Sequence, residues 1–175
     1  MASTVIGAGI TVEGEIVTDE DITIAGVVRG KVEAKASVSI EQGATVEADV
    51  TGSDVSVGGS LTGNVTATDR VVIATGGSLV TEPATYDLLL SACFVIWLSA
   101  KPDEHMGRVL AQGDLRPMAE GPQAMDDLKV ILESRTALYA KADIEVNTSD
   151  KNEAQAFAAL LAVIAQGRAP VEAAS

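Results

Sequence analysis

The sequence predicts a mixed fold: a right-handed parallel β-helix (β-solenoid) in the N-terminal half, followed by an incomplete, mostly helical α/β segment. Two observations predict it. A stretch of alternating apolar and polar residues recurs every 16 to 17 residues before position 80, and the composition changes at that position. Every aromatic residue and every proline lies after position 80, whereas 12 of the 16 glycines lie at or before Gly77. We therefore expect one core of small β-branched side chains and a second core of leucine, methionine and aromatic side chains.

The repeat in the first half consists of a short alternating stretch and a glycine-containing corner. The alternating stretches span residues 21–24, 37–40, 54–57 and 70–73. Strict alternation predicts a β-strand, and valine, isoleucine and threonine suit one. If successive coils wind around one axis, equivalent strands stack in parallel and bury shared columns of side chains. The column expected to form the core ladder for self-assembly contains Ile24, Ile40, Val57 and Ile73.

A second register of small residues supports the same interpretation. Its members are Gly14, Gly30, Ala48 and Gly63. Glycine is favoured where the backbone needs a positive φ or where two backbone segments approach closely. This register therefore predicts a corner of the coil that is too narrow for larger side chains.

A β-sandwich or barrel built from hairpins is the alternative fold for the first half. Hairpins favour Asn-Gly or Asp-Gly turns, and the nearest candidates here are Thr51-Gly52-Ser53 and Gly58-Gly59. A register that repeats over four coils is harder to obtain by accident than a pair of such turns. We therefore expect the solenoid.

Parts of this half resemble the start of the bactofilin domain. They are Ser3-Thr4-Val5-Ile6-Gly7, Gly14-Glu15-Ile16 and the run from Asp21-Ile22-Thr23-Ile24 to Lys31-Val32-Glu33-Ala34. The resemblance covers residues 3 to about 75 and implies a β-helix that polymerises without nucleotide into cytoplasmic or membrane-associated scaffold filaments. An uncapped solenoid would allow this, because it exposes unpaired strand edges and an apolar cross-section at each end. The expected partner is a second copy of the chain, in a homo-oligomer or filament.

The sequence also departs from the bactofilin pattern. The fifth coil breaks at Glu82-Pro83, so fewer coils are present than the family usually has. The repeat begins at residue 3, without the membrane-targeting tail that many relatives carry before the domain. We therefore expect no association with membranes.

The second half alternates between predicted strands and helices, which is typical of an α/β layer. The expected strands are residues 70–74, 93–98 and 143–146, and the expected helices are residues 84–91, 102–112, 124–140 and 150–166. Pro102 suits the first turn of a helix, where its missing N–H costs nothing. Asp150 and Glu153 have the spacing of a capping box for the last helix.

This half resembles the C-terminal part of shikimate kinase, in particular the shikimate-kinase-like domain of regulators of benzoyl-CoA breakdown. The matching stretches include the run from Val71-Val72-Ile73-Ala74 to Glu82-Pro83, Trp97-Leu98, Gly113-Asp114-Leu115-Arg116-Pro117-Met118, Leu138-Tyr139, Ala142-Asp143 and Asn147-Thr148-Ser149. The resemblance covers residues 70 to about 160. It implies that Gly76 and Gly77 lie against a substrate, that Arg116 reaches phosphates and that Arg135 holds a carboxylate. Glycine permits close backbone approach, and guanidinium groups match both anions.

The motif that phosphoryl transfer requires is missing. ATP-dependent kinases of this type hold phosphates and magnesium with the spacing G-x-x-x-x-G-K-[ST]. The only Gly-Lys pair is Gly30-Lys31, which Val32 follows inside a predicted solenoid coil. We therefore expect no catalytic residues, no cofactor and no enzyme activity.

Charge and composition exclude further classes of function. The formal net charge of −13 argues against nucleic acid as a partner, because phosphate backbones are bound by clustered lysine and arginine. His105 is the only histidine, which argues against a metal site. Cys93 is the only cysteine and is expected in a buried strand, and the absence of a recognisable signal peptide predicts a cytoplasmic location.

Three segments are therefore expected: a solenoid over residues 3–80, an α/β fragment over residues 81–168 and a disordered tail over residues 169–175. The leading hypothesis is a structural scaffold protein that self-assembles by stacking solenoid ends and carries an inactive kinase-like appendage. The alternative is a small-molecule sensor or degenerate kinase that binds an anion such as a nucleotide, shikimate or an acyl-CoA. A chimeric fusion without a selected function is a third hypothesis, because residues 70–79 suit both halves.

Overall fold

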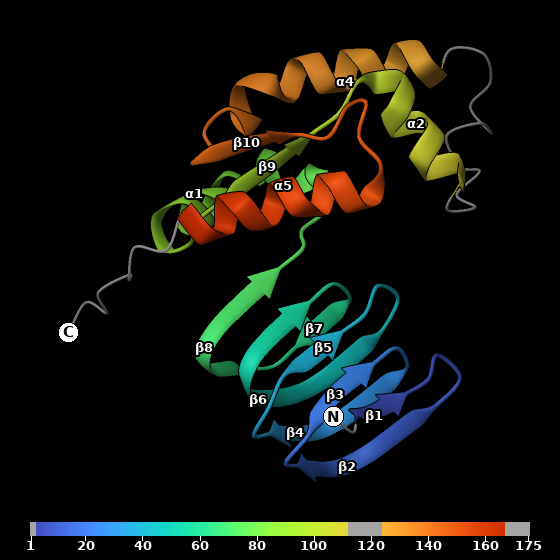
Figure 1. Ribbon diagram of the computed structural model, residues 1–175, viewed down its shortest axis with the longest axis vertical. Helices are drawn as coiled ribbons and strands as arrows, with labels where there is room; N and C mark the ends of the chain where they lie inside the picture. Colours follow the sequence, from blue (N-terminus) through green and yellow to red (C-terminus); the bar gives the residue numbers. More distant parts are fainter. Residues whose placement is uncertain (1–2, 112–123, 167–175) are drawn as a thin grey trace. The chain divides into compact units, whose positions relative to one another are not determined.

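The structure, a computed structural model, describes residues 3–111 and 124–166 (Figure 1). The chain divides into two compact units, Met1–Gly76 and Gly77–Ser175, each with its own internal contacts. The division lies slightly before the boundary expected at residue 80. The expected tail at residues 169–175 lies outside the described residues. Each unit is described by itself below.

The first unit is a parallel β-solenoid of about four turns, as the repeat predicted (Figure 1). Its eight strands belong to one sheet in which every pair is parallel. The strands are β1 (Ser3–Ile6), β2 (Thr11–Thr18), β3 (Asp21–Ile24), β4 (Val27–Ala34), β5 (Val38–Ile40), β6 (Thr45–Val57), β7 (Ser60–Thr62) and β8 (Val65–Ile73). Hairpins, the alternative weighed from the sequence, would have produced antiparallel pairs.

Each turn of the solenoid contributes strands to three faces. One face stacks β1, β3, β5, the end of β6 and the end of β8. The long strands β2, β4 and β6 bend at a corner, so each contributes to the other two faces. The pairs Ile24 with Ile40 and Val57 with Ile73 show that the register expected from the sequence is the register of the sheet.

The core of the solenoid contains small branched side chains stacked in columns. Its fully buried members are Ile22, Ile24, Val28, Val32, Val38, Ile40, Val46, Val50 and Val55. Fully burying an aliphatic side chain of this size contributes about 1.5–3 kcal/mol. The solenoid is therefore held together mainly by these columns.

The bend in β2 and β4 falls at a glycine. Gly14, Gly30 and Ala48 are in register across β2, β4 and β6, as expected. Gly30 has φ +125, and a Cβ added to it would collide with the carbonyl oxygen of Gly14 in the preceding coil. Both the backbone conformation and the close approach of two coils therefore require glycine at position 30.

The second unit is an α/β segment built around a two-stranded parallel sheet. Its described elements are η1 (Gly77–Thr81), α1 (Pro83–Ala92), β9 (Ile96–Ser99), α2 (Pro102–Ala111), α4 (Ala124–Tyr139), β10 (Ile144–Asn147) and α5 (Glu153–Gln166). The sequence predicted the α-helices and the two strands of this unit, and η1 is an addition. The expected strand at residues 70–74 is instead part of β8 in the solenoid.

Two local expectations in this unit are wrong. Cys93 is exposed and caps the end of α1, because its amide donates to the carbonyl of Leu89 and the strand starts only at Ile96. Asp150 does not cap α5, because its φ of +58 places it in the left-handed region. The reciprocal capping box is formed two residues later by Asn152 and Gln155.

The second unit buries few apolar side chains. Among the described residues, its buried apolar members are Val80, Tyr86, Met106 and Val146. Large apolar side chains remain exposed on its helices, on β9 and in the loop before β9: Leu88, Phe94, Leu98, Val130, Ile131, Phe157 and Leu161. A parallel sheet is normally covered on both faces and has more than two strands. The α/β segment is therefore incomplete, as the sequence predicted.

Candidate functional site

The expected core ladder runs the length of the solenoid, but its last member is not covered. Ile24, Ile40 and Val57 are buried, whereas Ile73, in register with Val57, is 52% exposed. Val71 faces the interior of the solenoid as Ile73 does, because its register partner Val55 is buried. Val71 is 43% exposed. The reason is position: β8 is the last strand of the sheet, and no coil follows it in this unit.

The other end of the solenoid is also less covered than the middle. Val12 and Ile16 of β2 are only partly buried. Their register partners one coil further along, Val28 and Val32, are completely buried. An additional coil next to β2 would bury Val12 and Ile16 to the same extent. The apolar columns are therefore least buried in the first and last described coils.

The outer surface of the first coils carries rows of alternating charge. The Arg29 guanidinium bonds Glu13 at 3.1 Å on one side and Glu47 at 2.9 Å on the other. Lys31 Nζ lies 3.1 Å from Glu15 Oε1 and 2.8 Å from Glu33 Oε2. Exposed pairs of this kind contribute little stability, so their main effect is to favour one register of stacked coils over others.

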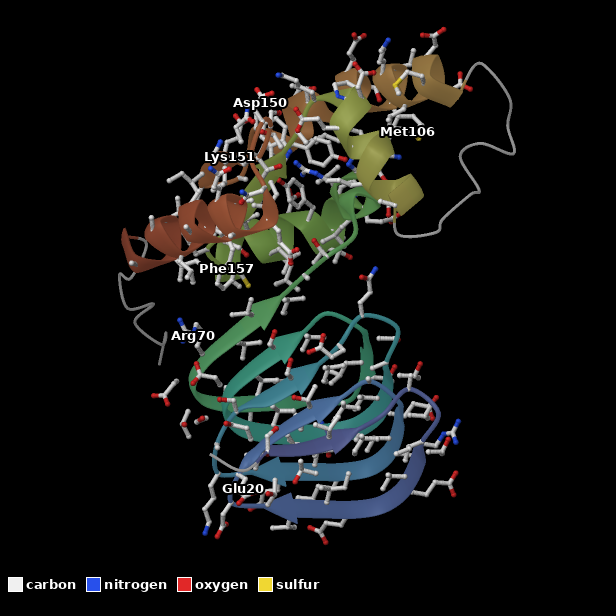
Figure 2. All side chains as sticks on the ribbon, turned by 45° about the vertical axis from the view of Figure 1, so that its right-hand side comes forward. Glu20, Arg70, Met106, Asp150, Lys151 and Phe157 are labelled. Atoms are coloured by element: carbon white, nitrogen blue, oxygen red, sulfur yellow. The ribbon has the colours of Figure 1, made fainter. Side chains whose placement is uncertain are left out.

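Hydrogen bonds on the solenoid surface lower the pKa values of two carboxyl groups. The hydrogen bond from Lys31 lowers the pKa of the Glu33 carboxyl, and the charge of Lys31 acts in the same direction. The backbone amide of Asn64, followed by its side-chain amide, lowers the pKa of Asp49, because both groups donate hydrogen bonds to the ionised form. Arg70, labelled in Figure 2, pairs with Asp54 at 3.0 Å one coil away.

Of the four residues expected to bind an anionic ligand, the structure describes three: Gly76, Gly77 and Arg135. Arg116 lies outside the described residues. Gly76 ends the first unit and Gly77 begins η1 in the second. Arg135 is half-buried on α4, one helical turn before Tyr139. The carbonyl of Gly77 accepts a hydrogen bond of 2.9 Å from the Tyr139 hydroxyl, so this glycine is engaged within the unit.

The structure adds a polar cluster that the sequence did not predict. Arg108 of α2 donates to the hydroxyl of Thr148 at 2.8 Å and to its carbonyl at 3.0 Å. Thr148 is buried, and its hydroxyl donates to the carbonyl of Ser99 at the end of β9. Lys101 pairs with Asp150, which is labelled in Figure 2, at 2.7 Å. No local pattern could reveal this cluster, because its partners lie 40 to 49 residues apart.

The cluster lies at the carboxyl ends of the two parallel strands, directly after Ser99 and Asn147. Ligands of open α/β sheets bind at this edge. In this chain the charged groups of the cluster satisfy one another: Lys101 pairs with Asp150, and Arg108 pairs with Glu104. Within the described ranges, no group of histidine, cysteine, aspartate and glutamate side chains could hold a metal ion.

Two family models match the chain. A model described as bactofilin, polymer-forming cytoskeletal, matches residues 4–90, and a model of shikimate kinase matches residues 60–165. The chain belongs to the shikimate kinase family, whose model covers more than half of it, and its first half is similar to bactofilins. The two matches overlap over residues 60–90, which contain β8. In the structure β8 pairs with β6, so the shared strand belongs to the bactofilin solenoid.

Individual relatives match each half separately. The bactofilin BacO of Myxococcus xanthus (strain DK1622) is 50% identical over 29% of this chain and 40% of its own length. The shikimate kinase of Synechococcus sp. (strain CC9605) is 37% identical over 46% of this chain and 40% of its own length. The shikimate kinase of Symbiobacterium thermophilum is 37% identical over 42% of this chain and 43% of its own length. The chain therefore spans less than half the length of these relatives.

No solved structure matches the chain with significance. Among the helices that the structure describes, none has both the length and the apolar character that crossing a bilayer requires.

Proposed function

We propose that this chain is a cytoplasmic scaffold subunit that self-associates by stacking the ends of its bactofilin solenoid. The observation that supports this most directly is the exposure of core-ladder positions on the last strand, β8. Val71 and Ile73 face the axis of the solenoid, yet about half of each side chain is open to water. A coil from a second copy would bury both and would pair the free edge of β8.

The α/β unit is proposed to have no kinase activity. The chain contains no sequence with the spacing of a phosphate-binding P-loop, so the phosphates and magnesium of ATP would have no cradle. The chain also spans only 40% of the Synechococcus shikimate kinase that it resembles. We propose that this unit is an appendage of the scaffold.

Assembly can be tested with a pair of substitutions on the same strand. Val72 lies between Val71 and Ile73 but faces outward, because it pairs with the solvent-facing Ser56, and it is 44% exposed. Ile73→Lys places a charge in the apolar cross-section, whereas Val72→Lys places the same charge beside it at similar exposure. We expect filaments or large oligomers of the wild type and of Val72→Lys without nucleotide, and smaller species of Ile73→Lys.

Negative-stain electron microscopy and size-exclusion chromatography with light scattering measure this difference. Circular dichroism of both variants would verify that the solenoid still folds. A monomeric wild type would contradict the proposed self-association. Equal assembly of the two variants would exclude the β8 end as the contact surface.

The second candidate function is the binding of a small anion by the α/β unit. It is favoured by the half-buried Arg135 on α4, the residue to which the resemblance to shikimate kinase assigns a carboxylate. A thermal shift assay with ATP, shikimate and CoA esters at millimolar concentration tests it, with Arg135→Gln as the matched variant. A shift that Arg135→Gln abolishes would support the sensor. No shift with any ligand would count against it.

A further inference from the structure

Two segments of the chain have the same sequence but belong to different units. Gly58-Gly59-Ser60-Leu61 leads from β6 into β7 of the solenoid. One coil later, Gly76-Gly77-Ser78-Leu79 follows β8, yet from Gly77 onward this segment forms η1 of the α/β unit. The match to bactofilins also extends past this segment, to residue 90. The local sequence is therefore compatible with a further solenoid strand as well as with η1.

The corner between Ile73 and Leu79 has the length that the solenoid requires at this point. From each member of the core ladder to the next apolar column, the spacing alternates between six and four residues along the chain. These corners run from Ile6 to Val12, from Ile24 to Val28, from Ile40 to Val46 and from Val57 to Leu61. A corner of six residues comes next in this alternation, and Leu79 lies six residues after Ile73.

The backbone already follows the solenoid path at the start of this corner. The Ala74 amide donates to the carbonyl of Val57 at 2.9 Å. In the preceding six-residue corner, the equivalent bond joins the Glu41 amide to the carbonyl of Ile24 at 2.8 Å. If the chain completed the corner in the same way, residues 78–80 would lie beside β7.

The free edge of β7 can accept such a strand. Among the described strands, only β6 pairs with β7. Leu61 of β7 is partly buried, whereas its register partner Val46 is completely buried. Leu79 would stack on Leu61, and Ser78 and Val80 would face outward as the exposed Ser60 and Thr62 do. A strand in this place would therefore extend the column of Val46 by one member.

In the structure, the α/β unit holds the segment instead. The Tyr139 hydroxyl bonds the carbonyl of Gly77 at 2.9 Å, and Val80 is buried. The competing strand would also be short. Pro83 follows Leu79 at the spacing at which Val65 follows Leu61, so the next strand of a fifth coil would start at a residue without an N–H. These contacts and this limit explain why η1 is the position observed.

We infer that residues 77–81 switch between two positions: η1 of the α/β unit, and a short strand paired with the free edge of β7 of the same chain, with Leu79 on Leu61. One consequence rests on the self-association proposed above. The strand would occupy the edge of β7 that a coil of a second copy needs, so the η1 position is the one that permits stacking at this end of the solenoid.

Pairs of cysteines measure how often the strand position is visited. In the background Cys93→Ser, Leu61→Cys with Leu79→Cys would place two thiols at register neighbours of adjacent strands. Such neighbours have Cα atoms about 4.8 Å apart, a distance that a disulfide spans. The matched control is Leu61→Cys with Ser78→Cys, because residue 78 would face outward. The rate of disulfide formation in a glutathione buffer is followed by non-reducing electrophoresis and mass spectrometry.

Val80→Thr shifts the balance between the two positions. In the α/β unit it places a hydroxyl at a buried apolar site. On the strand the same residue would face outward and complete the sequence of β7, Ser-Leu-Thr. We therefore expect Val80→Thr to populate the strand about tenfold more.

The register pair should form its disulfide at least about tenfold faster than the control pair, and Val80→Thr should accelerate the register pair by about a further tenfold. The control pair should change much less. Equal rates for the two pairs would overturn the inference, as would a register pair that Val80→Thr does not accelerate. Equal acceleration of both pairs would also overturn it, because it would indicate unfolding of η1 without docking. A disulfide found only between chains would assign the edge of β7 to a second copy.

Electron microscopy of the register pair tests the consequence for assembly. We expect fewer and shorter filaments of the oxidised protein than of the reduced protein. Equal assembly of both forms would contradict the competition for the edge of β7. A wild type that does not assemble would contradict the self-association alone, because the disulfide rates report on the switch within a single chain.

Discussion

The hydroxyl of Tyr139 donates a hydrogen bond of 2.9 Å to the backbone carbonyl of Gly77 and so joins the end of α4 to the first residue of the α/β unit. Tyr139 also stacks on Trp97 of β9, with ring centroids 5.5 Å apart. Tyr139→Phe keeps the stack and removes the hydrogen bond. We expect it to lower the free energy of unfolding of this unit by about 1 kcal/mol.

Urea unfolding followed by the fluorescence of Trp97, the only tryptophan, measures this change. Tyr139→Leu also removes the stacking on Trp97. It should lower the free energy of unfolding by about 0.5–1.5 kcal/mol more than Tyr139→Phe does. Identical midpoints for Tyr139→Phe and the wild type would show that the hydrogen bond does not stabilise the unit.

A second prediction concerns the glycine corner of the solenoid. Gly30→Ala introduces a Cβ that collides with the carbonyl of Gly14 and requires a φ of +125 from alanine. We expect the solenoid to lose several kcal/mol of stability, about 3 or more, because neither coil can move without breaking the strand pairing.

Gly9→Ala is the matched control, because among the described residues nothing lies within 4 Å of its Cβ position. Far-ultraviolet circular dichroism during thermal unfolding should show a large decrease in melting temperature for Gly30→Ala and almost none for Gly9→Ala. Comparable melting temperatures for both variants would contradict the assignment of this corner.

A third prediction separates folding from assembly along the core ladder. Ile24→Ala creates a cavity in the buried column and should cost about 2–5 kcal/mol of unfolding free energy. Ile73→Ala removes a side chain that is half exposed in the single chain, so it should change this free energy by only about 0.5 kcal/mol.

The same two variants should rank differently in assembly. Light scattering measures the particle mass across a dilution series. Oligomers of Ile73→Ala should dissociate at a higher protein concentration than those of the wild type, although the fold is intact. If Ile73→Ala destabilises the isolated fold as much as Ile24→Ala does, Ile73 is buried in the single chain and cannot report on stacking.

A fourth prediction concerns pH. Hydrogen bonds from the backbone and the side chain of Asn64 lower the pKa of Asp49 below its usual value of 3.8. Because the pKa is lower in the folded state, the ionised carboxylate stabilises the solenoid fully above pH 3.8. This contribution is lost as the pH falls from 3.8 through the folded-state pKa.

A carboxyl-carbon NMR titration should therefore place the Asp49 midpoint below 3.8. Asn64→Ala removes one of the two hydrogen bonds and should raise the midpoint part of the way back. A midpoint that is unaffected by this substitution would assign the shift to the backbone amide alone.

The solenoid was predictable because its signal repeats. Ile24, Ile40 and Val57 recur at nearly constant spacing, and a parallel stack converts a constant spacing directly into a shared column. The bend at Gly30 followed from the same repetition. The exposure of Ile73 did not, because the register of a side chain says nothing about whether another coil covers it.

In the α/β unit, individual helices and strands were predictable, but their details were not. Asn152 rather than Asp150 caps the last helix, because Asp150 adopts a positive φ that its spacing to Glu153 does not reveal. Cys93 is exposed because α1 continues to Ala92 and the strand begins later than its apolar sequence indicated. Arg108 and Thr148 meet only through the packing of α2 on the strand ends.

By itself, the sequence determined the periodic half of this protein, the incompleteness of the other half and the lack of a P-loop motif, since each of these is carried by local spacing or by the presence of a motif. Only the tertiary structure decided which unit uses the shared strand β8 and which positions of the core ladder remain exposed. Those features depend on what lies next to a residue in space, and in a stack of coils the neighbours of an end coil are not encoded in its own sequence.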